Sequence, residues 1–460
     1  MADLTFEEWR RIGAAKLDAQ STRALWYQNY YDGDNAVTAL MDAEERQNFR
    51  TFLKESRANW CELVVNAVAE RLQVVGFRFG PGNASGAHAW EIWQGSSLDA
   101  DAELAQTDAL VCGSAFALIN LDDDNPTGVT ITGESPMEAC VIYAPGSRRQ
   151  RLAGYKRYRV LDRTTEILIL PDAVVTWYPN GGDPEIEANS TGTVNLVEIQ
   201  PQPRSTRPPR SELHSAVHFQ DRINTTIFNR LVATDYGAFR QIWATGVKLA
   251  RQVLTSPDGT ETVSVVKPFD VGANRLLANE NPDARFGSFT ESSLRGYLDS
   301  VTQDVEQLAA ITQTPPHYLL GTMVNLSADA IKAAEAGLVS KIERRSRHIG
   351  EAWEEVMRVA LRLTDDPNSE DVAGEVIWKD FETRSEAQLV DALVKMATLG
   401  VPTEVLWQRW GATPQEIEQW RQMKATEQAS AAINQAVALG AADPYSQLLA
   451  GASGNAPGLP

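Results

Sequence analysis

The feature that most constrains this sequence is a proline pair, Pro315 and Pro316, followed by one very long amphipathic segment. Proline lacks an amide hydrogen and disfavours helical geometry in the preceding residue, so a helix arriving from the N-terminal side must end near Thr314. A second helix is predicted to begin at Ser327, whose hydroxyl can cap its first amides. Its apolar residues recur at spacings of three and four: Ile331, Leu338, Ile342, Ile349, Trp353, Val356, Ala360 and Leu363. Unbroken to Leu363, this helix would be roughly 55 Å long at 1.5 Å per residue, so a large structure must receive it.

The N-terminal part of the chain predicts an α+β fold. Helices are expected up to residue 34, over 59–73 and over 88–110. Segments rich in β-branched and aromatic residues then alternate with Gly, Pro, Asp and Asn, which is typical of an antiparallel meander. The predicted strands are 115–120, 140–143, 154–161, 166–170, 173–178 and 195–200.

The remainder is predicted to be mainly helical, with one small β-rich insertion. A proline-rich connector at 201–210 precedes a helix over 211–240, and short strands follow over 246–286, with a hairpin turn at 256–259. The next helix, 291–313, has a narrow apolar seam formed by Leu294, Leu298, Val301, Val305 and Leu308. Three short helices are expected over 383–428. The chain beyond Ala441 lacks periodicity and is expected to be disordered.

Charge and cysteine usage exclude several classes of protein. The formal charge of −19, from 42 basic and 61 acidic residues, argues against a general nucleic-acid-binding surface. The three cysteines are far apart in apolar segments, which favours buried thiols in a reducing compartment. The first residues lack the apolar core of a signal peptide, and no uncharged run is long enough to cross a bilayer. We therefore expect synthesis in the cytoplasm and no membrane partner.

The search for catalytic or metal-binding motifs gives little support for an enzyme. There is no P-loop, and His214 and His218, although at helical spacing, lack a third metal ligand nearby. The acidic run Asp122, Asp123 and Asp124 lacks the alternating spacing of a calcium loop and is better explained as a solvated turn. We expect no catalytic residue, no metal and no cofactor.

Two basic clusters are candidates for phosphate contact. The first comprises Arg148, Arg149, Arg151, Lys156, Arg157 and Arg159, interleaved with Tyr155 and Tyr158. Strand alternation would split this cluster between two faces, so a solvated sheet edge or a subunit contact is the better interpretation. The second comprises Lys341, Arg344, Arg345 and Arg347. There, Glu343 precedes Arg347 by four residues, which predicts partial local pairing.

Several segments, taken in this order, resemble the portal proteins of tailed bacteriophages of the siphophage type. They are TPPHYLLG, AAEAGLVSKIERR and GEAWEEVMRVAL in the long-helix region, NWCELVVNAVAERLQVVGFRF at 59–79, and RPPRSELHSAVHFQDRINTTIFNRL at 207–231. The resemblance covers nearly the whole chain. It implies a portal fold with an α/β wing, a two-helix stem, a small β-rich clip, a long wing helix and a helical crown. The implied boundaries are 1–205 for the N-terminal wing, 206–243 and 289–314 for the stem helices, 244–288 for the clip, 315–363 for the channel loop and long wing helix, 364–440 for the linker and crown, and 441–460 for the disordered tail.

The resemblance also implies a function: a ring, normally of twelve subunits, at one capsid vertex of the virion, through which DNA is packaged and ejected. Double-stranded DNA, the terminase large subunit, a head-tail adaptor, and the major capsid and scaffold proteins are the implied partners. The residues assigned to these roles are Gly321, Thr322, Met323, Val324, Asn325 and Leu326 in a DNA-facing loop, Asp299 and Glu306 on the channel wall, Thr255, Ser256, Pro257, Asp258, Gly259, Thr260, Glu261 and Thr262 in the docking clip, and Trp353 at a subunit contact. Another capsid or head-tail structural protein is the alternative interpretation, and a hydrolase with an unrecognised site is a third.

Overall fold

The structure is a computed structural model, and it describes residues 4–37, 47, 49–80, 84–179, 181–238, 242–246, 251–255, 261–265, 283, 285–288, 293–321, 328–382 and 386–438. The chain divides into two compact units. Unit 1 comprises Met1–Asp34, Asn59–Val217 and Ala309–Pro460, and unit 2 comprises Asn35–Ala58 and His218–Leu308. Residues 35–58, which the sequence boundaries placed in the first segment, therefore belong to the same unit as the insertion.

Helix α1, Phe6–Tyr31, begins at a capping box and buries one stripe of side chains. The Thr5 hydroxyl accepts a hydrogen bond from the Glu8 amide, and the Glu8 carboxylate accepts one from the Thr5 amide. The buried stripe consists of Trp9, Gly13, Leu17, Gln20, Ala24, Tyr27 and Tyr30. Helix α4, Trp60–Ala69, is capped by Asn59. Both predicted helices are thus confirmed, although α4 ends a few residues early.

The helical structure predicted over 88–110 is confirmed, although it is divided between two helices. Helix α5 spans Ala84–Gly95 and helix α6 spans Leu98–Cys112. Ser97, between them, adopts a left-handed conformation with φ of 56°, which no α-helix can continue through. The prediction did not include this break.

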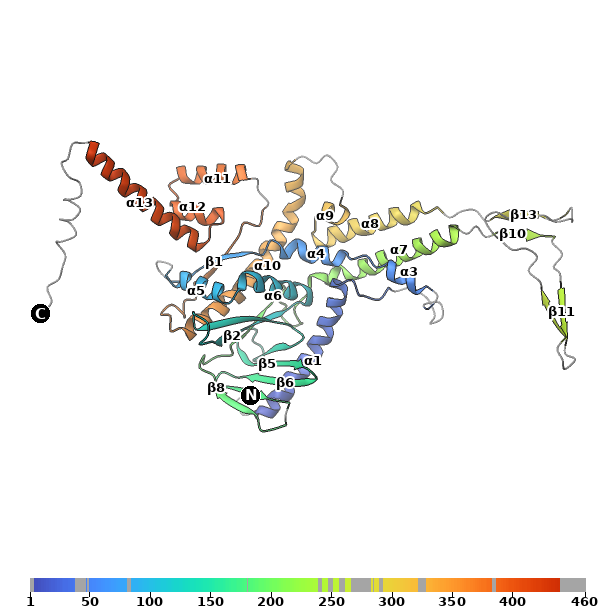
Figure 1. Cartoon of the computed structure of the whole chain (residues 1–460), viewed down its shortest axis with the longest axis horizontal. Helices are drawn as coiled ribbons and strands as arrows, with labels where there is room; N and C mark the ends of the chain where they lie inside the picture. Colours follow the sequence, from blue (N-terminus) through green and yellow to red (C-terminus); the bar gives the residue numbers. More distant parts are fainter. Residues whose placement is uncertain are drawn as a thin grey trace. The chain divides into compact units, whose positions relative to one another are not determined.

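The two larger of the three antiparallel sheets in unit 1 contain three and five strands (Figure 1). One has the order β3-β2-β9, from Val129–Glu134, Ala115–Leu121 and Leu196–Ile199. The other is a five-stranded meander, β4 to β8, from Ala139–Tyr143, Arg151–Val160, Arg163–Ile169, Ala173–Trp177 and Glu185–Ala188. The predicted antiparallel meander is confirmed, whereas β3 and β8 were not predicted.

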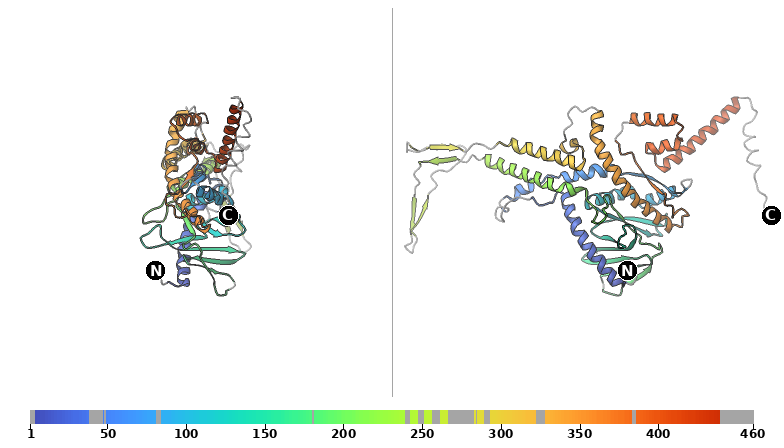
Figure 2. Two further views of the ribbon diagram at one scale, coloured as in Figure 1. Left: turned by 90° about the vertical axis from the view of Figure 1, so that its left-hand side faces the viewer. Right: turned by 180° about the vertical axis from the view of Figure 1, so that it is seen from behind.

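Helix α1 lies against the five-stranded sheet, as Figures 1 and 2 show. The core between them contains Leu17, Cys140, Tyr155 and Ile169, all buried. A Cβ on Gly13 would lie 2.6 Å from the Tyr155 ring, so only glycine allows the helix to approach this closely.

A third pairing joins segments about 300 residues apart in sequence. Strand β1, Val74–Arg78, pairs antiparallel with β14, Glu375–Trp378, and Phe77 lies opposite Val376. Because this ladder depends on which distant segments meet, local sequence patterns did not reveal it.

The long helix predicted to end at Leu363 is confirmed. Helix α10 spans Ala328–Leu363, 36 residues, and its predicted apolar stripe is buried from Leu338 to Ala360. It follows the short helix α9, Pro316–Leu320. The three predicted C-terminal helices are α11, Glu386–Thr398, α12, Thr403–Trp410, and α13, Pro414–Ala438, of which the last is longer than expected. The predicted disorder beyond Ala441 lies outside the described residues.

Unit 2 contains most of two long helices and short strand pairs. Helix α7 spans Val217–Ala238, after the 3-10 turn η2, Glu212–Ser215, and helix α8 spans Arg295–Thr312. Within the unit, Arg222 of α7 forms an ion pair with Asp304 of α8, and Phe49, just before helix α3 (Arg50–Glu55), packs edge-on against Phe228. Strand β10, Ile242–Thr245, pairs with β13, Arg285–Ser288, and β11, Arg251–Thr255, pairs with β12, Glu261–Val265. Thr255 lies opposite Glu261, which supports the predicted hairpin, but the turn residues themselves lie outside the described ranges.

Candidate functional site at a buried helix junction

The centre of the candidate site is Glu212, which lies just before the chain leaves unit 1. Ser211 precedes it and caps η2, because its hydroxyl accepts a hydrogen bond from the Leu213 amide at 2.9 Å. This cap fixes the backbone at Glu212 and holds its carboxylate inside the protein, where the side chain is only 4% exposed. A buried carboxylate requires compensating partners.

Those partners come from one face of the long helix α10. Lys341 and Arg345 are four residues apart, so their side chains project from the same side of the helix. The Lys341 Nζ lies 3.2 Å from Glu212 Oε2, and Arg345 pairs with Glu212 Oε1. Gln202, in the proline-rich connector, donates a further hydrogen bond to Glu212 Oε1 at 2.7 Å. Both carboxylate oxygens are therefore satisfied.

The same lysine also holds the end of helix α8. Lys341 Nζ donates a hydrogen bond to the Thr312 carbonyl at 2.9 Å, and Arg344 donates one to the Gln313 side chain at 2.8 Å. A cation at the C-terminal end of a helix complements both its unpaired carbonyls and its dipole. Glu212, Thr312 and Lys341, which we call the helix junction, thus connect three helical segments within unit 1.

Burial and ion pairing together determine the pKa values of Glu212 and Lys341. Burial alone would raise the pKa of Glu212, but the charges of Lys341 and Arg345 outweigh it and hold that pKa below its usual value. Burial lowers the pKa of Lys341, and the neighbouring Glu212 opposes that shift only in part. Glu212 is consequently ionised at neutral pH and serves as the fixed negative centre of the junction.

Helix α8 ends at Thr312, just before the proline pair, as the sequence predicts. Gln313 takes a left-handed conformation with φ of 54°, and the Thr314 amide donates to the Ala309 carbonyl at 3.0 Å. Pro316 then starts α9. The prediction of a rigid stop at Thr314 to Pro316 is confirmed.

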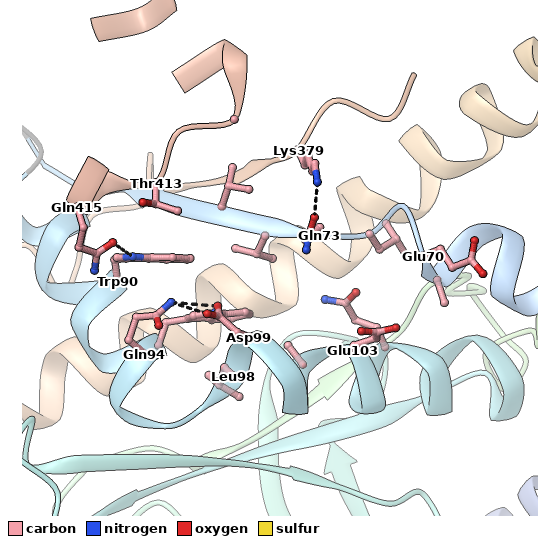
Figure 3. A pocket seen from close by; sticks show the side chains of 18 residues that line it. Glu70, Gln73, Trp90, Gln94, Leu98, Asp99, Glu103, Lys379, Thr413 and Gln415 are labelled. Atoms are coloured by element: carbon pink, nitrogen blue, oxygen red, sulfur yellow. Dashed lines mark hydrogen bonds between the residues drawn. The ribbon is translucent and has the colours of Figure 1, made fainter. Parts of the chain in front are cut away.

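A pocket of about 560 Å³ lies elsewhere in unit 1, between the α4–β1 turn, α5, α6 and the α12–α13 turn (Figure 3). Its side chains are largely tied to one another: Trp90 donates to Gln415 at 2.6 Å, and Trp93 and Gln94 both donate to Asp99. The described lining residues include three carboxylates and one lysine, but no histidine, cysteine or serine. Such a set does not provide the nucleophile and base expected of a hydrolase.

The search for a metal site among the described residues is also negative. No group of three or more His, Cys, Asp or Glu side chains there is arranged to hold an ion. The three cysteines, Cys61, Cys112 and Cys140, are buried and form no disulfide, as predicted. Burial raises the pKa of Cys112 and of Cys140 to about 12, so neither thiol is activated. Within the described ranges, no helix combines the length and apolarity needed to cross a membrane.

Most of the first basic cluster is used for internal pairing. Arg151 pairs with Glu355, Lys156 with Glu134, Arg157 with Asp18, and Arg159 with Asp162. Tyr155 is fully buried. Arg148, Arg149 and Arg159 are exposed, but Arg149 lies 3.5 Å from Glu351, so the cluster as a whole is not a phosphate site.

Comparison with known proteins then identifies the family. The family described as "Phage portal protein, SPP1 Gp6-like" matches residues 14–430, which is most of the chain. The chain belongs to this family. It is 28% identical over 419 residues to the portal protein of Mycobacterium phage L5, with 87% of this chain and 85% of that protein covered. It is also 28% identical over 386 residues to the portal protein of Mycobacterium phage D29, with 80% and 78% covered.

Two solved particle structures are also similar to this phage portal family member. The neck of an empty gene transfer agent particle aligns at 13% identity and a TM-score of 0.42, covering 80% of this chain and 88% of that chain. A chain from the virion of a native gene transfer agent particle aligns at 14% identity and a TM-score of 0.39, covering 85% and 94%.

The predicted channel and clip residues are only partly within the described ranges. Asp299 and Glu306 are both exposed on α8, in keeping with the predicted solvent-facing side. Gly321 caps the end of α9 with φ of 64°, but Thr322 to Leu326 lie outside the described residues. In the clip, Thr255, Glu261 and Thr262 lie in the β11–β12 pair, whereas Ser256 to Thr260 lie outside.

One predicted portal contact is wrong. Trp353 was assigned to a subunit contact, but its side chain is fully buried within unit 1. Its ring packs edge-on against Trp93 with centroids 5.1 Å apart, and its indole nitrogen donates to Gln106 at 3.3 Å. Since this side chain has no exposed surface, it cannot touch a neighbouring subunit, and its role is to hold α10 in the core.

The local pairing predicted for Arg347 is wrong too, since no ion pair joins Glu343 and Arg347 in this described helix. Sequence reasoning also missed the helix junction. Glu212 lies in the segment that resembles portal proteins, but its partners lie about 130 residues later in the chain. The available signal was the basic cluster at 341–347, two of whose members, Lys341 and Arg345, pair with Glu212.

Proposed function

We propose that this protein assembles into a ring at one vertex of a phage capsid and serves as the conduit for DNA packaging and ejection. The observation that carries this proposal is the family match over residues 14–430. The ring is normally twelve-fold in this family. On this basis the protein is a component of the virion, made in the host cytoplasm.

The segments of the ring subunit follow from the order of elements. Helices α7 and α8, connected by the β10–β13 and β11–β12 strand pairs, correspond to the stem and clip. Helix α10 corresponds to the long wing helix, the sheets of unit 1 to the wing, and α11 to α13 to the crown. In this assignment Asp299 and Glu306 line the channel, Gly321 to Leu326 approach DNA, and Thr255 to Thr262 dock the terminase large subunit and then a head-tail adaptor.

The helix junction gives these parts a mechanical connection. It ties the turn before α7, the end of α8 and the middle of α10 through one buried carboxylate. The turn before α7 and the end of α8 are therefore both held to α10 by one side chain, Lys341.

The alternatives receive less support. Head-tail adaptors are usually much shorter and do not need a helix, β-insertion, helix arrangement. For a hydrolase, the described pocket lacks a nucleophile paired with a base. We propose no catalytic role, no cofactor and no membrane partner.

Electron microscopy of the purified protein tests the proposal. We expect closed rings with a central channel. A protein that stays monomeric at high concentration, in the presence and absence of scaffold protein, would contradict it.

A further inference from the structure

A basic groove follows one side of helix α10, next to the helix junction. Three pockets with volumes of about 220, 380 and 300 Å³ form it, and neighbouring pockets share lining residues. The first and second share Gln202, Arg344 and Arg345, and the second and third share Pro203 and His348. Each pocket therefore adjoins the next through side chains that line both, and we refer to the three together as the groove.

The middle pocket of this groove is lined by basic side chains and has no carboxylate in its described lining. Its described lining comprises Arg344, Arg345, Arg347 and His348 together with Pro201, Gln202 and Pro203, without a carboxylate. Arg347 is exposed and forms no hydrogen bond or ion pair within the described part of the chain, and Arg344 has only the neutral Gln313 as a partner. Arg148 approaches from the β4–β5 turn. His348 is exposed, and partial desolvation together with the charges of Arg345, Arg148 and Arg347 lowers its pKa.

The carboxylates near the two ends of the groove do not neutralise its centre. Glu212 is buried and already paired with Lys341 and Arg345. At the other end, Glu351 lies near Arg149, and Glu355 pairs with Arg151. Glu343, one helical turn from Arg347, is exposed but not paired with it. A concentrated positive surface thus persists on a chain whose net charge is −19.

The net charge indicates what kind of partner this groove accepts. A strongly negative chain repels DNA at long range, which disfavours capture of phosphates at an isolated groove. Identical negative chains must nevertheless contact one another in a ring, and such head-to-tail contacts join two different patches. A basic patch facing an acidic patch of the next copy provides the required charge complementarity.

A run of three acidic residues lies at the end of β2, in the β3-β2-β9 sheet whose strand β9 leads into the connector that lines the groove. Asp122, Asp123 and Asp124 form the turn after β2, and Asp122 is held in place by Thr130, which donates to it at 2.6 Å. Asp123 and Asp124 are exposed, and their carboxylates have no partner within the described part of the chain. Strand β2 begins at Ala115, opposite Ile199, just before the prolines that line the groove. The acidic turn is therefore separated from the groove by the length of β2, roughly 20 Å at 3.4 Å per residue.

We propose that the acidic turn of one copy, Asp122 to Asp124, binds in the basic groove of the adjacent copy and forms the head-to-tail contact of the ring. This inference rests on the proposed ring function. The guanidinium groups of Arg344 and Arg347 receive the Asp123 and Asp124 carboxylates, an arrangement that suits the forked donors of arginine.

Charge reversal on each side, and on both together, tests this contact. Arg344→Glu with Arg347→Glu should raise the protein concentration needed for half-maximal ring formation at least ~10-fold. Asp123→Arg with Asp124→Arg should do the same, and the four-fold variant should restore assembly. Arg159→Glu with Arg163→Glu, which makes the same charge change at an exposed turn, is the matched control and should assemble normally.

The readouts separate the possible outcomes. Ring formation is followed by mass photometry and electron microscopy, and circular dichroism establishes that each variant is folded. Wild-type chains that form no ring would contradict the ring function itself. If wild-type rings form, the inference is overturned by normal assembly of the groove variant, by failure of the four-fold variant to recover, or by loss of DNA binding with assembly unchanged.

Discussion

Glu212 and Lys341 form a buried ion pair, with 3.2 Å between Oε2 and Nζ and side-chain exposures of 4% and 2%. Because Lys341 also donates to the Thr312 carbonyl, this single lysine contacts both the turn before α7 and the end of α8. Buried ion pairs add little stability over an apolar replacement, but removing one partner leaves a charge without compensation. The pair therefore matters more for holding the three helices in one arrangement than for overall stability.

The first prediction concerns this pair. Lys341→Met should lower the free energy of unfolding by about 1–3 kcal/mol, because Glu212 loses one of its two cationic partners and keeps Arg345, while the Thr312 carbonyl loses its donor. Lys395→Met, the same substitution at a side chain that is 73% exposed, should cost no more than about 1 kcal/mol. Urea unfolding followed by tryptophan fluorescence measures both. Adding Glu212→Gln to Lys341→Met should recover part of the loss, and a double variant less stable than Lys341→Met would contradict the ion-pair interpretation.

The second prediction concerns pH. The pKa of Glu212 in the folded protein lies below its usual value of 4.5, so its stabilising contribution is present above pH 4.5 and is lost as the pH falls through the folded pKa. The difference in unfolding free energy between wild type and Glu212→Gln should be largest near neutral pH and should shrink below about pH 4.5. Urea titrations at a series of pH values between neutral and acidic measure it. A difference that stays constant over this range would show that Glu212 does not titrate in the pair.

The third prediction concerns Trp353. Trp353→Ala should destabilise the protein by about 3–5 kcal/mol, because it removes a fully buried ring that packs on Trp93. Trp410→Ala, at a ring that is 55% exposed, should have a much smaller effect. Thermal unfolding of the dissociated chain separates this role from one at a subunit interface. A variant of normal stability that fails only in assembly would restore the original assignment.

The fourth prediction concerns the proposed channel wall. Asp299→Lys with Glu306→Lys should leave ring assembly intact and reduce DNA packaging or retention, since lysines facing the channel would bind phosphates and hinder sliding. Glu185→Lys with Glu187→Lys, on the exposed strand β8, makes the same charge change away from α8 and should package normally. Packaged DNA is measured as nuclease-resistant DNA per particle. Full heads in the α8 variant would remove the acidic-wall proposal.

Local features of the fold were predictable because they depend on neighbours in sequence. The Thr5 capping box, the stop at Pro315 and Pro316, and the three-and-four spacing of α10 each specify their own segment. The helical character of 88–110 was predictable, but the interruption at Ser97, where the backbone is left-handed, was not.

Features that depend on distant partners were not predictable. Lys341 and Trp353 occupy the same helix and both are buried, yet one meets a carboxylate and the other an aromatic cluster. The spacing of apolar residues distinguishes buried from exposed positions, but it does not show which residue a buried side chain packs against. It therefore could not show whether Lys341 or Trp353 contacts a partner subunit. The same limit applies to Arg347. We expected its guanidinium group to pair with Glu343, but the side chain is exposed in the groove.

The pairing of β1 with β14 has a consequence for synthesis of the protein. Strand β1 is complete at Arg78, but its partner ends at Trp378, so its hydrogen-bonding edge stays open until most of the chain has left the ribosome. All residues of unit 2 precede Ala309, whereas unit 1 is completed only when its C-terminal part has been synthesised. The nascent chain therefore exposes an unpaired strand for the time needed to translate about 300 residues, during which host chaperones have an accessible target.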